Sequence, residues 1–345
     1  MTLDIKSMTS AELSEMLVSL KQPKFRAKQI FDWLHVKKVN LFEEMSNLPK
    51  ALIEKLNENC SITSLGIERK LISEIDGTMK YLFSLPDHEY VESVFMRYKH
   101  GNSICISTQV GCKMGCAFCA STKAGFVRNL TASEILEQIY AVTKDTGEKI
   151  SNVVLMGIGE PLDNFDNVTR FLDLLSCEEG HNLSLRHVSL STCGVVDKIY
   201  ELANRKYGLT LSISLHAPND KLRSQTMPIN QKWNIDELLT ACKEYAKVTG
   251  RRISFEYALI QGVNDTKECA DELATKLKGM LCHVNLIPVN EIKEADFRKS
   301  NQQNVISFQQ QLVKRGINTT IRRTLGADIS AACGQLRRDV DQKET

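Results

Sequence analysis

Apolar residues recur at helical spacing in the first part of this chain. The pattern at Leu13, Met16, Leu17 and Leu20 places one apolar stripe along a helix surface. Thr9 or Ser10 offers a side-chain cap for the start of that helix. We expect three helices here: from Thr9 or Ser10 to about residue 20, from about Pro23 to Val36, and from about Leu48 to Asn59. Residues 1–60 are therefore predicted to form a small helical accessory domain.

The pattern changes to strict alternation between residues 61 and 100. Runs at 71–72, 78–83 and 91–96 predict antiparallel strands, with Asp76-Gly77 and Pro86-Asp87 as turn residues. Glu92 lies within the last run, where alternation with Val91 allows an exposed position on one strand face. We expect a small antiparallel sheet that connects the helical domain to the rest of the chain.

Strands and helices alternate from residue 103 onward. The expected strands cover 103–108, 152–156, 188–192, 209–215, 252–259 and 283–287. The first expected helix begins at Thr131 or Ser133 and ends near residue 144. The other expected helices cover 166–175, 197–204, 235–249, 267–278 and 304–314. Such alternation indicates parallel strands joined by right-handed crossovers. Six units are too few for a closed eight-stranded barrel, so residues 101–345 are predicted to form a partial (β/α)6 barrel, with its site at the carboxyl ends of the strands.

The composition is that of an ordinary globular protein. The chain has 345 residues, 42% hydrophobic and 25% charged, and a formal net charge of +2. It contains neither an uninterrupted apolar stretch of about 20 residues nor an N-terminal secretory pattern, so we expect no membrane span and a cytoplasmic location. Its 11 cysteines are an odd number in a long chain without such a signal, which argues against a disulfide framework.

Three cysteines stand close together in the segment QVGCKMGCAFC. Cys112, Cys116 and Cys119 have the spacing C-x3-C-x2-C. Unstrained disulfides cannot pair all of them, because a bridge needs a particular separation and dihedral angle. A structural zinc site is the alternative, but such sites usually have four ligands in two pairs. Three thiolates leave one iron of a [4Fe-4S] cluster without a protein ligand, so the spacing indicates a cluster with an open site.

Polar residues recur after successive predicted strands. Gly159 and Glu160 follow the second strand, and Glu160 could receive an ammonium group; a tight turn explains the glycines equally well. Ser191 follows the third strand, Ser214 and His216 the fourth, and Asn290 the sixth. A single histidine is more often structural, but its place in this series favours a ligand contact.

Basic residues gather near both ends of the chain. Small residues surround Cys333, which indicates an accessible thiol, although a structural cysteine is the simpler interpretation of the local sequence. A polyanionic substrate such as RNA suits the basic residues on either side of it: Lys314, Arg315, Arg322, Arg323, Arg337 and Arg338. The second helix has a similar surplus, which is either a solvated face or an RNA phosphate contact: Lys21, Lys24, Arg26, Lys28, Lys37 and Lys38.

Together these motifs resemble the RlmN family of radical S-adenosylmethionine (SAM) enzymes. The resemblance covers nearly the whole chain and rests on QVGCKMGCAFC, MGIGEP, SLHAPND, MPIN, CHVNLIPVN and GADISAACGQL. It implies a radical SAM barrel and methylation of an adenine at C2, in 23S ribosomal RNA (adenine 2503) and in tRNA (adenine 37). The sister Cfr family methylates C8 of the same ribosomal adenine and confers antibiotic resistance. Arg322-Arg323 and Gly334-Gln335-Leu336-Arg337 look more like the C2 enzymes.

The resemblance also implies a role for individual residues. Cys112, Cys116 and Cys119 would bind the [4Fe-4S] cluster, and the SAM site would comprise Gly159, Glu160, Ser191, Ser214, Leu215, His216 and Asn290. Cys333 would be the methyl carrier, as an S-methylcysteine. Glu92 would accept a proton, and Cys105 would resolve a covalent RNA intermediate through a transient disulfide. Two SAM molecules would be used per turnover, one to methylate Cys333 and one as the radical source.

The expected partners follow from the same resemblance. They are 23S rRNA, tRNA and an electron donor such as flavodoxin or ferredoxin, and the enzyme is expected to be a monomer. Two alternatives stay open at this point. One is Cfr-like methylation at C8, and the other is a non-catalytic, metal-bound RNA-binding protein.

Overall fold

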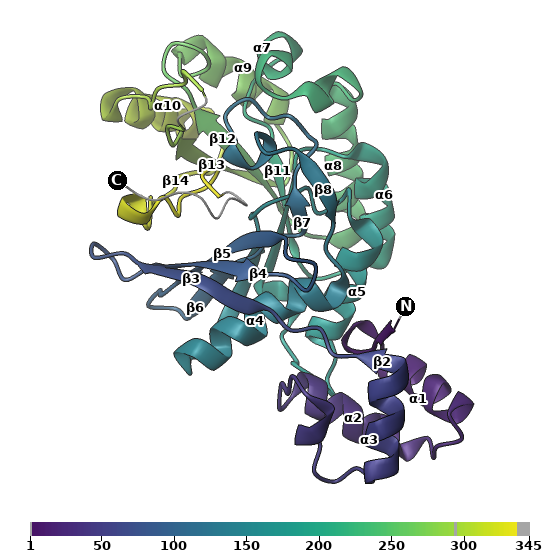
Figure 1. Ribbon diagram of the computed structural model, residues 1–345. Helices are drawn as coiled ribbons and strands as arrows, with labels where there is room; N and C mark the ends of the chain where they lie inside the picture. Colours follow the sequence, from purple (N-terminus) through teal and green to yellow (C-terminus); the bar gives the residue numbers. More distant parts are fainter. Residues whose placement is uncertain (1, 293–294, 337–345) are drawn as a thin grey trace.

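The computed structural model describes residues 2–292 and 295–336, and a ten-stranded sheet runs through it (Figure 1). The strand order is β14-β13-β12-β11-β10-β9-β6-β5-β4-β3. The parallel strands are β6 (Asn102–Cys105), β9 (Ile150–Leu155), β10 (Val188–Thr192), β11 (Thr210–Ser214), β12 (Ile253–Leu259), β13 (Cys282–Pro288) and β14 (Thr319–Ile321).

Helices cover the outer face of the parallel strands (Figure 1). They are α4 (Ala132–Thr146), α5 (Phe165–Ser176), α6 (Val196–Arg205), α8 (Ile235–Thr249), α9 (Lys267–Leu277) and α10 (Gln302–Lys314). Alternating strands and helices of this kind make the predicted partial barrel, and that prediction is confirmed. The short β14 adds a parallel strand beyond the six that the sequence predicts, and α7 (Asp220–Thr226) is an additional helix after β11.

The three antiparallel strands belong to the same sheet as the barrel. They are β3 (Gly66–Ile72), β4 (Met79–Ser84) and β5 (Tyr90–Met96), and β5 pairs with β6. The predicted antiparallel strands are present, and they extend the barrel sheet instead of standing apart from it. The register of β5 against β6 pairs Val94 with Cys105 and Phe95 with Ile104, so backbone hydrogen bonds continue without interruption into the barrel.

The first predicted barrel strand is shorter than expected. It ends at Cys105, and β7 (Gln109–Gly111) then pairs with β8 (Phe126–Asn129) in a separate hairpin that encloses the cysteine segment. Gly111 has φ +72°, and a Cβ atom there would lie 1.7 Å from the carbonyl oxygen of Gly125. Only glycine fits this crossing, so the base of the cysteine segment is fixed by two backbones in close contact.

The N-terminal residues form a helical unit beside the barrel (Figure 1). It contains α1 (Ser10–Ser19), α2 (Phe25–His35) and α3 (Lys50–Asn59), and the short parallel strands β1 (Leu3–Asp4) and β2 (Cys60–Ser61) close it. Thr9 and Glu12 cap α1 reciprocally. Short 3-10 turns complete the fold: η1 (Ile5–Ser7), η2 (Phe42–Glu44), η3 (Ala120–Thr122), η4 (Leu185–His187), η5 (Pro228–Gln231) and η6 (Ala327–Ile329).

Buried polar contacts join this helical unit to α4 of the barrel. The Nζ atom of Lys6 lies 2.7 Å from the Glu137 carboxylate and 2.7 Å from the carbonyl oxygen of Thr63. His35 Nδ1 lies 3.1 Å from the Tyr140 hydroxyl. Charges buried in this way are tolerated only when they are paired, so the geometry of the junction is closely specified.

Arg337 and Arg338, part of the predicted basic surface, lie outside the described residues. Within the described ranges, no helix is long and apolar enough to cross a lipid bilayer.

Candidate active site

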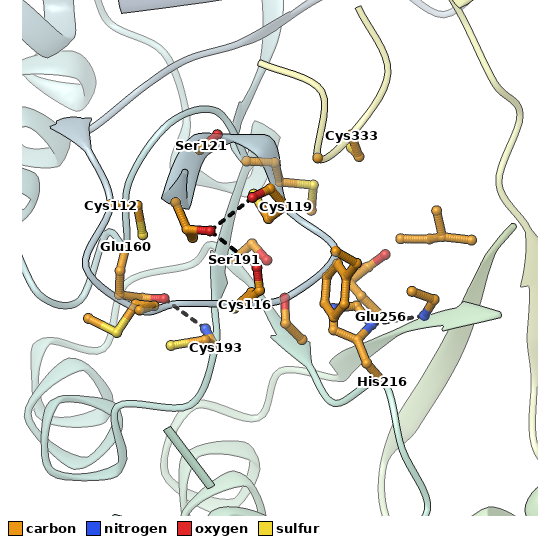
Figure 2. A pocket seen from close by; sticks show the side chains of 18 of the residues that line it. Cys112, Cys116, Cys119, Ser121, Glu160, Ser191, Cys193, His216, Glu256 and Cys333 are labelled. Atoms are coloured by element: carbon orange, nitrogen blue, oxygen red, sulfur yellow. Dashed lines mark hydrogen bonds between the residues drawn. The ribbon is translucent and has the colours of Figure 1, made fainter. Parts of the chain in front are cut away.

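A cavity of about 160 Å³ opens at the carboxyl ends of the parallel strands (Figure 2). Residues from the cysteine segment, from the strand ends and from the C-terminal loop line it. Among the predicted site residues, the cavity brings together Cys112, Cys116, Cys119, Gly159, Glu160, Ser191, Ser214, His216, Asn290 and Cys333. Side chains far apart in sequence therefore meet where the barrel prediction puts them.

The three cysteines of the segment all line this cavity as free thiols. Burial raises the pKa of the Cys112 thiol to about 12 and also raises the pKa values of Cys116 and Cys119. Neighbouring thiols add to the effect on Cys116. Buried thiols become thiolates when a metal coordinates them, because the cation offsets the cost of burying the charge.

The donor set suits an iron–sulfur cluster better than a single ion. In the part of the chain that the structure describes, no three His, Cys, Asp or Glu side chains converge on one ion position. Each thiolate of a [4Fe-4S] cluster binds a different iron, so its ligands stand apart around the cube. Three soft sulfur donors line one cavity, so Cys112, Cys116 and Cys119 could hold such a cluster.

Gly159 and Glu160 form the cavity wall after β9. Gly159 has φ +105°, and a Cβ atom there would lie 2.6 Å from the Cβ atom of Gln109 and 2.8 Å from its backbone nitrogen. The Glu160 carboxylate accepts backbone hydrogen bonds from Cys193 at 2.7 Å and from Leu162 at 3.0 Å. Burial raises the pKa of Glu160, and those backbone donors oppose the rise. This carboxylate is thus rigidly aimed, as a site for an ammonium group requires.

His216 is held in one tautomer. It is buried, with φ +57°, and its Nδ1 accepts a hydrogen bond of 2.8 Å from the backbone N–H of Ala258. Burial lowers the pKa of His216 to about 3, helped by the nearby Arg223 cation. A neutral ring that accepts at Nδ1 carries its proton at Nε2. The histidine can therefore act as a hydrogen-bond donor toward a ligand, with no charge of its own.

The remaining predicted SAM-site residues divide into two groups. Ser191, Ser214 and Asn290 line the cavity, and Asn290 Nδ2 donates a 3.0 Å hydrogen bond to the carbonyl oxygen of Cys333. Leu215 does not line it, because its side chain is 1% exposed in the hydrophobic core. The Leu215 backbone N–H donates to the carbonyl oxygen of Glu256.

Cys333 lies on a loop that we call the carrier loop, residues 326–336 (Figure 2). The carrier loop is tied to the cysteine segment at one end: Ala120 N–H donates to Gly334 O at 2.8 Å, and Ser121 Oγ donates to Leu336 O at 2.9 Å. At the other end, Asp328 accepts hydrogen bonds from the β3–β4 turn. The loop thus spans from the cysteine segment to the antiparallel strands.

A second, smaller cavity of about 40 Å³ adjoins the first and contains Cys105. Cys333 lines both cavities, as do Met156, Asn290 and Arg322. Burial raises the pKa of Cys105 to about 12, and the nearby Cys333 thiol adds to the rise. The structure therefore brings Cys105 and Cys333 to the same cavity, although 228 positions separate them in the sequence.

Glu92 is on β5, and neither of the two cavities includes it among its lining residues. Alternation allowed an exposed position for Glu92, but its side chain is buried. Lys80 Nζ lies 3.4 Å from Glu92 Oε1. Glu92 is two residues before Val94, which lines the second cavity, so both side chains are on one face of the sheet. Glu92 is therefore on the sheet face that bears the second cavity, although it is not among the residues that line it.

Sequence reasoning missed two buried charged residues of this site. Glu256 on β12 lines the first cavity, accepts a 2.8 Å hydrogen bond from Asn285 Nδ2, and has Arg322 Nη1 3.9 Å away. Arg223 donates to the carbonyl oxygen of Cys193 at 2.6 Å and to that of Leu215 at 3.2 Å. A charged residue inside an apolar strand was the available signal for Glu256.

Comparison with known protein families extends these observations. Residues 106–274 match the model of the radical SAM superfamily. Residues 3–62 match the model of the ribosomal RNA large subunit methyltransferase N-terminal domain. The two matches together cover the helical unit and most of the barrel.

Individual relatives resemble the chain over nearly its full length. It is 54% identical over 336 residues to the probable dual-specificity RNA methyltransferase RlmN of Clostridium novyi, covering 97% of this chain and 98% of the relative. The corresponding protein of Alkaliphilus oremlandii is 55% identical over 336 residues, with the same coverage. A radical SAM methyltransferase from Sphaerobacter thermophilus has a crystal structure with a TM-score of 0.93 and 42% identity, covering 98% of this chain and 100% of that one.

Proposed function

Because the chain belongs to the RlmN family of dual-specificity radical SAM RNA methyltransferases, we propose that it methylates C2 of adenine 2503 in 23S rRNA and of adenine 37 in tRNA. The methyl group would pass through Cys333. The observation that carries this proposal is the position of Cys333, which lines both the cavity of the three cluster cysteines and the cavity of Cys105.

The cofactors of the superfamily are a [4Fe-4S] cluster and SAM. We assign the cluster to Cys112, Cys116 and Cys119. SAM is assigned to the adjoining wall of the first cavity, made by Gly159, Glu160, Ser191, Ser214, His216 and Asn290. Leu215 is not part of this assignment, because its side chain is buried in the hydrophobic core and its backbone is hydrogen-bonded to Glu256 and Arg223. When bound together, cluster and SAM supply a carbon radical that can remove a hydrogen atom from a methyl group.

Cys333 first has to gain a methyl group by polar displacement. Its thiolate attacks the electrophilic methyl of a sulfonium, the C–S bond of the sulfonium breaks, and the thiol proton goes to solvent. Arg322 lines both cavities with Cys333, so its guanidinium lies where it stabilises a thiolate. The carrier is needed because C2 of adenine is electron-poor and does not attack a sulfonium itself.

Release of the product requires a base and a second thiol. A methylene radical of Cys333 that has added to C2 leaves one unpaired electron and the C2 proton on the adduct. The electron would return to the bound cluster, and we assign removal of the proton to Glu92. The ion pair with Lys80 fixes where this carboxylate lies. Cys105 then attacks the sulfur of Cys333: an S–S bond forms, the S–CH₂ bond breaks, and its electron pair with a proton completes the methyl group. Such exchange needs two sulfurs within bonding reach, which their shared cavity supports.

The wider setting is part of the same proposal. RNA of both kinds would be the substrate, and enzymes that act on a base pull it from its stack. We propose the cytoplasm as the compartment, a monomer as the active form, and a flavodoxin or ferredoxin as the reductant of the cluster. The disulfide between Cys105 and Cys333 would need reduction before the next turnover.

One experiment tests the reaction directly. The purified protein is reconstituted anaerobically with iron and sulfide, then incubated with SAM, dithionite and either an rRNA fragment or tRNA. Mass spectrometry and comparison with authentic nucleosides locate the methyl group. We expect 2-methyladenosine in both RNAs; 8-methyladenosine would favour Cfr-like regiochemistry, and bound zinc without deoxyadenosine release would favour a non-catalytic RNA-binding protein.

Cluster assignment has its own test. Cys112→Ala should lose iron, sulfide and the brown absorbance after reconstitution, because two thiolates do not retain the cube. Cys177→Ala is the matched control, since Cys177 is a half-buried thiol outside the cavity. Equal iron content in the two variants would contradict the assignment.

A further inference from the structure

The turn between β5 and β6 carries a stacked pair of rings. Tyr98 and His100 have ring centroids 5.1 Å apart and planes inclined by 21°. Tyr98 is half-buried and lines the second cavity together with Cys105 and Cys333, whereas His100 is exposed. The pair therefore extends from the wall of the second cavity to the surface.

Cations surround this pair on the same side. Arg323 is exposed and lines the second cavity, and Lys99 is exposed on the turn itself. Arg97, by contrast, is committed to the fold, because it donates to Glu148 at 2.6 Å and 2.9 Å and to the Gly77 carbonyl oxygen. The positive charge that remains near the rings therefore comes from Arg323 and Lys99.

The Tyr98 ring packs at the edge of a small hydrophobic cluster, and the exposed His100 ring stacks on it. The Tyr98 hydroxyl donates a weak hydrogen bond to Met96 Sδ at 3.7 Å. Burial raises the pKa of Tyr98, so the phenol is neutral. A neutral aromatic face beside cations is the surface on which unpaired nucleotide bases stack, with their phosphates on the cations.

We propose that Tyr98 and His100 form a platform for an RNA base next to the target adenine, with Arg323 binding an adjacent phosphate. This inference rests on the proposed role of Cys333, because the platform matters only if the target adenine reaches that thiol. Stacking accepts every base, since each has a π face. A platform of this kind holds the flanking nucleotide of two different RNAs without reading its sequence, as an enzyme with both rRNA and tRNA substrates requires.

The test uses a short RNA hairpin with 2-aminopurine on the 5′ or the 3′ side of the target adenine. Reconstituted enzyme should quench the fluorescence at one of these two positions, because stacking on a ring quenches 2-aminopurine. Tyr98→Leu should abolish the quenching and weaken RNA binding by at least about five-fold. Tyr98→Phe should keep both, because the ring is retained, and His100→Ala should fall between them.

Arg323→Ala gives a second, independent readout. A lost phosphate contact on single-stranded RNA should lower the slope of log K against log salt by about 0.7. Tyr200→Leu is the matched control, because Tyr200 is an exposed tyrosine on α6, outside both cavities. SAM-dependent methylation of Cys333, followed by peptide mass spectrometry without RNA, checks that each variant is folded and loaded.

The outcomes separate this inference from the proposed function. Undiminished quenching and affinity in Tyr98→Leu, or equal losses in Tyr98→Phe, would overturn the platform even if C2 methylation is found. Quenching that depends on the Tyr98 ring supports the platform even if the methyl group turns out to be at C8.

Discussion

Single residues decide whether this site works, and two thiols outside the cluster matter most. Cys333 and Cys105 share a cavity, and neither forms a disulfide in this structure. The proposed reaction gives them different tasks, because Cys333 would carry carbon while Cys105 would only attack sulfur. Replacing each one should therefore stop the reaction at a different stage.

Cys333→Ala should eliminate RNA methylation while iron and sulfide content stay normal, since the cluster ligands are untouched. Cys105→Ala should instead accumulate a covalent RNA–protein adduct, because the link to Cys333 forms but is not cleaved. Denaturing gels with labelled RNA and metal analysis measure both effects. Methylated RNA from Cys333→Ala, or a Cys105→Ala enzyme that turns over without adduct, would remove the basis for the carrier assignment. Cys242→Ala, at a buried thiol on α8, serves as the control.

Gly159 is a second residue with a specific prediction. Gly159→Ala places a Cβ atom 2.6 Å from Gln109 and forces an alanine to φ +105°. The strain of about 1–3 kcal/mol should displace the wall beside Glu160 and lower SAM affinity strongly. Gly250→Ala at the end of α8 is the control, because it has a positive φ but no atom within 4 Å of the added Cβ. Equilibrium SAM binding and thermal unfolding distinguish the two variants. Equal SAM affinity in both would contradict the assignment of the Gly159 wall to SAM binding.

At the level of elements, the carrier loop is held by contacts from opposite sides of the site. Asp328 accepts a 2.6 Å hydrogen bond from Ser73 Oγ and a 2.9 Å bond from Glu74 N–H, while Asp76 accepts from Gly326 N–H at 2.9 Å. Hydrogen bonding by Ser73 lowers the pKa of Asp328. The β3–β4 turn therefore positions a loop that is 250 residues away in sequence.

Asp328→Ala should loosen the carrier loop without affecting the cluster. The backbone amides of the carrier loop, residues 326–336, should exchange hydrogen faster in this variant. Alkylation of Cys333 by iodoacetamide should accelerate several-fold. Hydrogen-exchange and peptide mass spectrometry measure these effects. Glu201→Ala, at an exposed carboxylate on α6, should change neither. Exchange in the loop that is no faster than in the unsubstituted protein would show that Asp328 does not anchor it.

The sequence predicted the repeating elements well, because their periodicity is strong. Helix α8 and strand β10 begin and end where expected, and the family and the barrel are confirmed. The short strands β14 and β7 were not predicted, because three residues each are too few to show an alternation of apolar and polar positions. The site residues remain predictions, but their convergence could be anticipated from the strand ends. Glu256 gave a signal as a charged residue inside an apolar strand, but its partners Asn285 and Arg322 could not be anticipated, because they come from other elements.

At the scale of the whole molecule, the junction of the helical unit with the barrel is polar and buried. His35 and Tyr140 meet there, and His35 Nε2 has no hydrogen-bond partner among the residues that the structure describes. Burial lowers the pKa of His35 to about 3, helped by the Lys6 charge. The folded protein therefore keeps this ring neutral at pH values where the unfolded chain protonates it.

Acid should weaken the fold through this junction. A histidine with a depressed pKa contributes its full stability above about pH 6.5 and loses it as the pH falls toward 3, so lowering the pH from 7.5 to 5.5 costs about 1.4 kcal/mol. In the double variant His35→Phe/Tyr140→Phe, the free energy of unfolding should lose the part of its pH dependence that comes from His35. The parts that come from His181 and His216 should remain. Denaturant unfolding at both pH values measures it, with the exposed His88→Gln as control. An unchanged pH dependence in the double variant would exclude His35 as its source.

The carrier loop also bears on how such an enzyme arises. It follows β14, the last strand of the sheet, and crosses to the turn between β3 and β4, which stand at the opposite edge (Figure 1). The carrier loop thus bridges the two edges of the open sheet, and it contributes no strand to the pairing within that sheet. In evolutionary terms, a thiol on such a loop can be acquired, exchanged or lost while the inherited sheet stays as it was. New chemistry on this scaffold is therefore expected to begin with changes in the carrier loop.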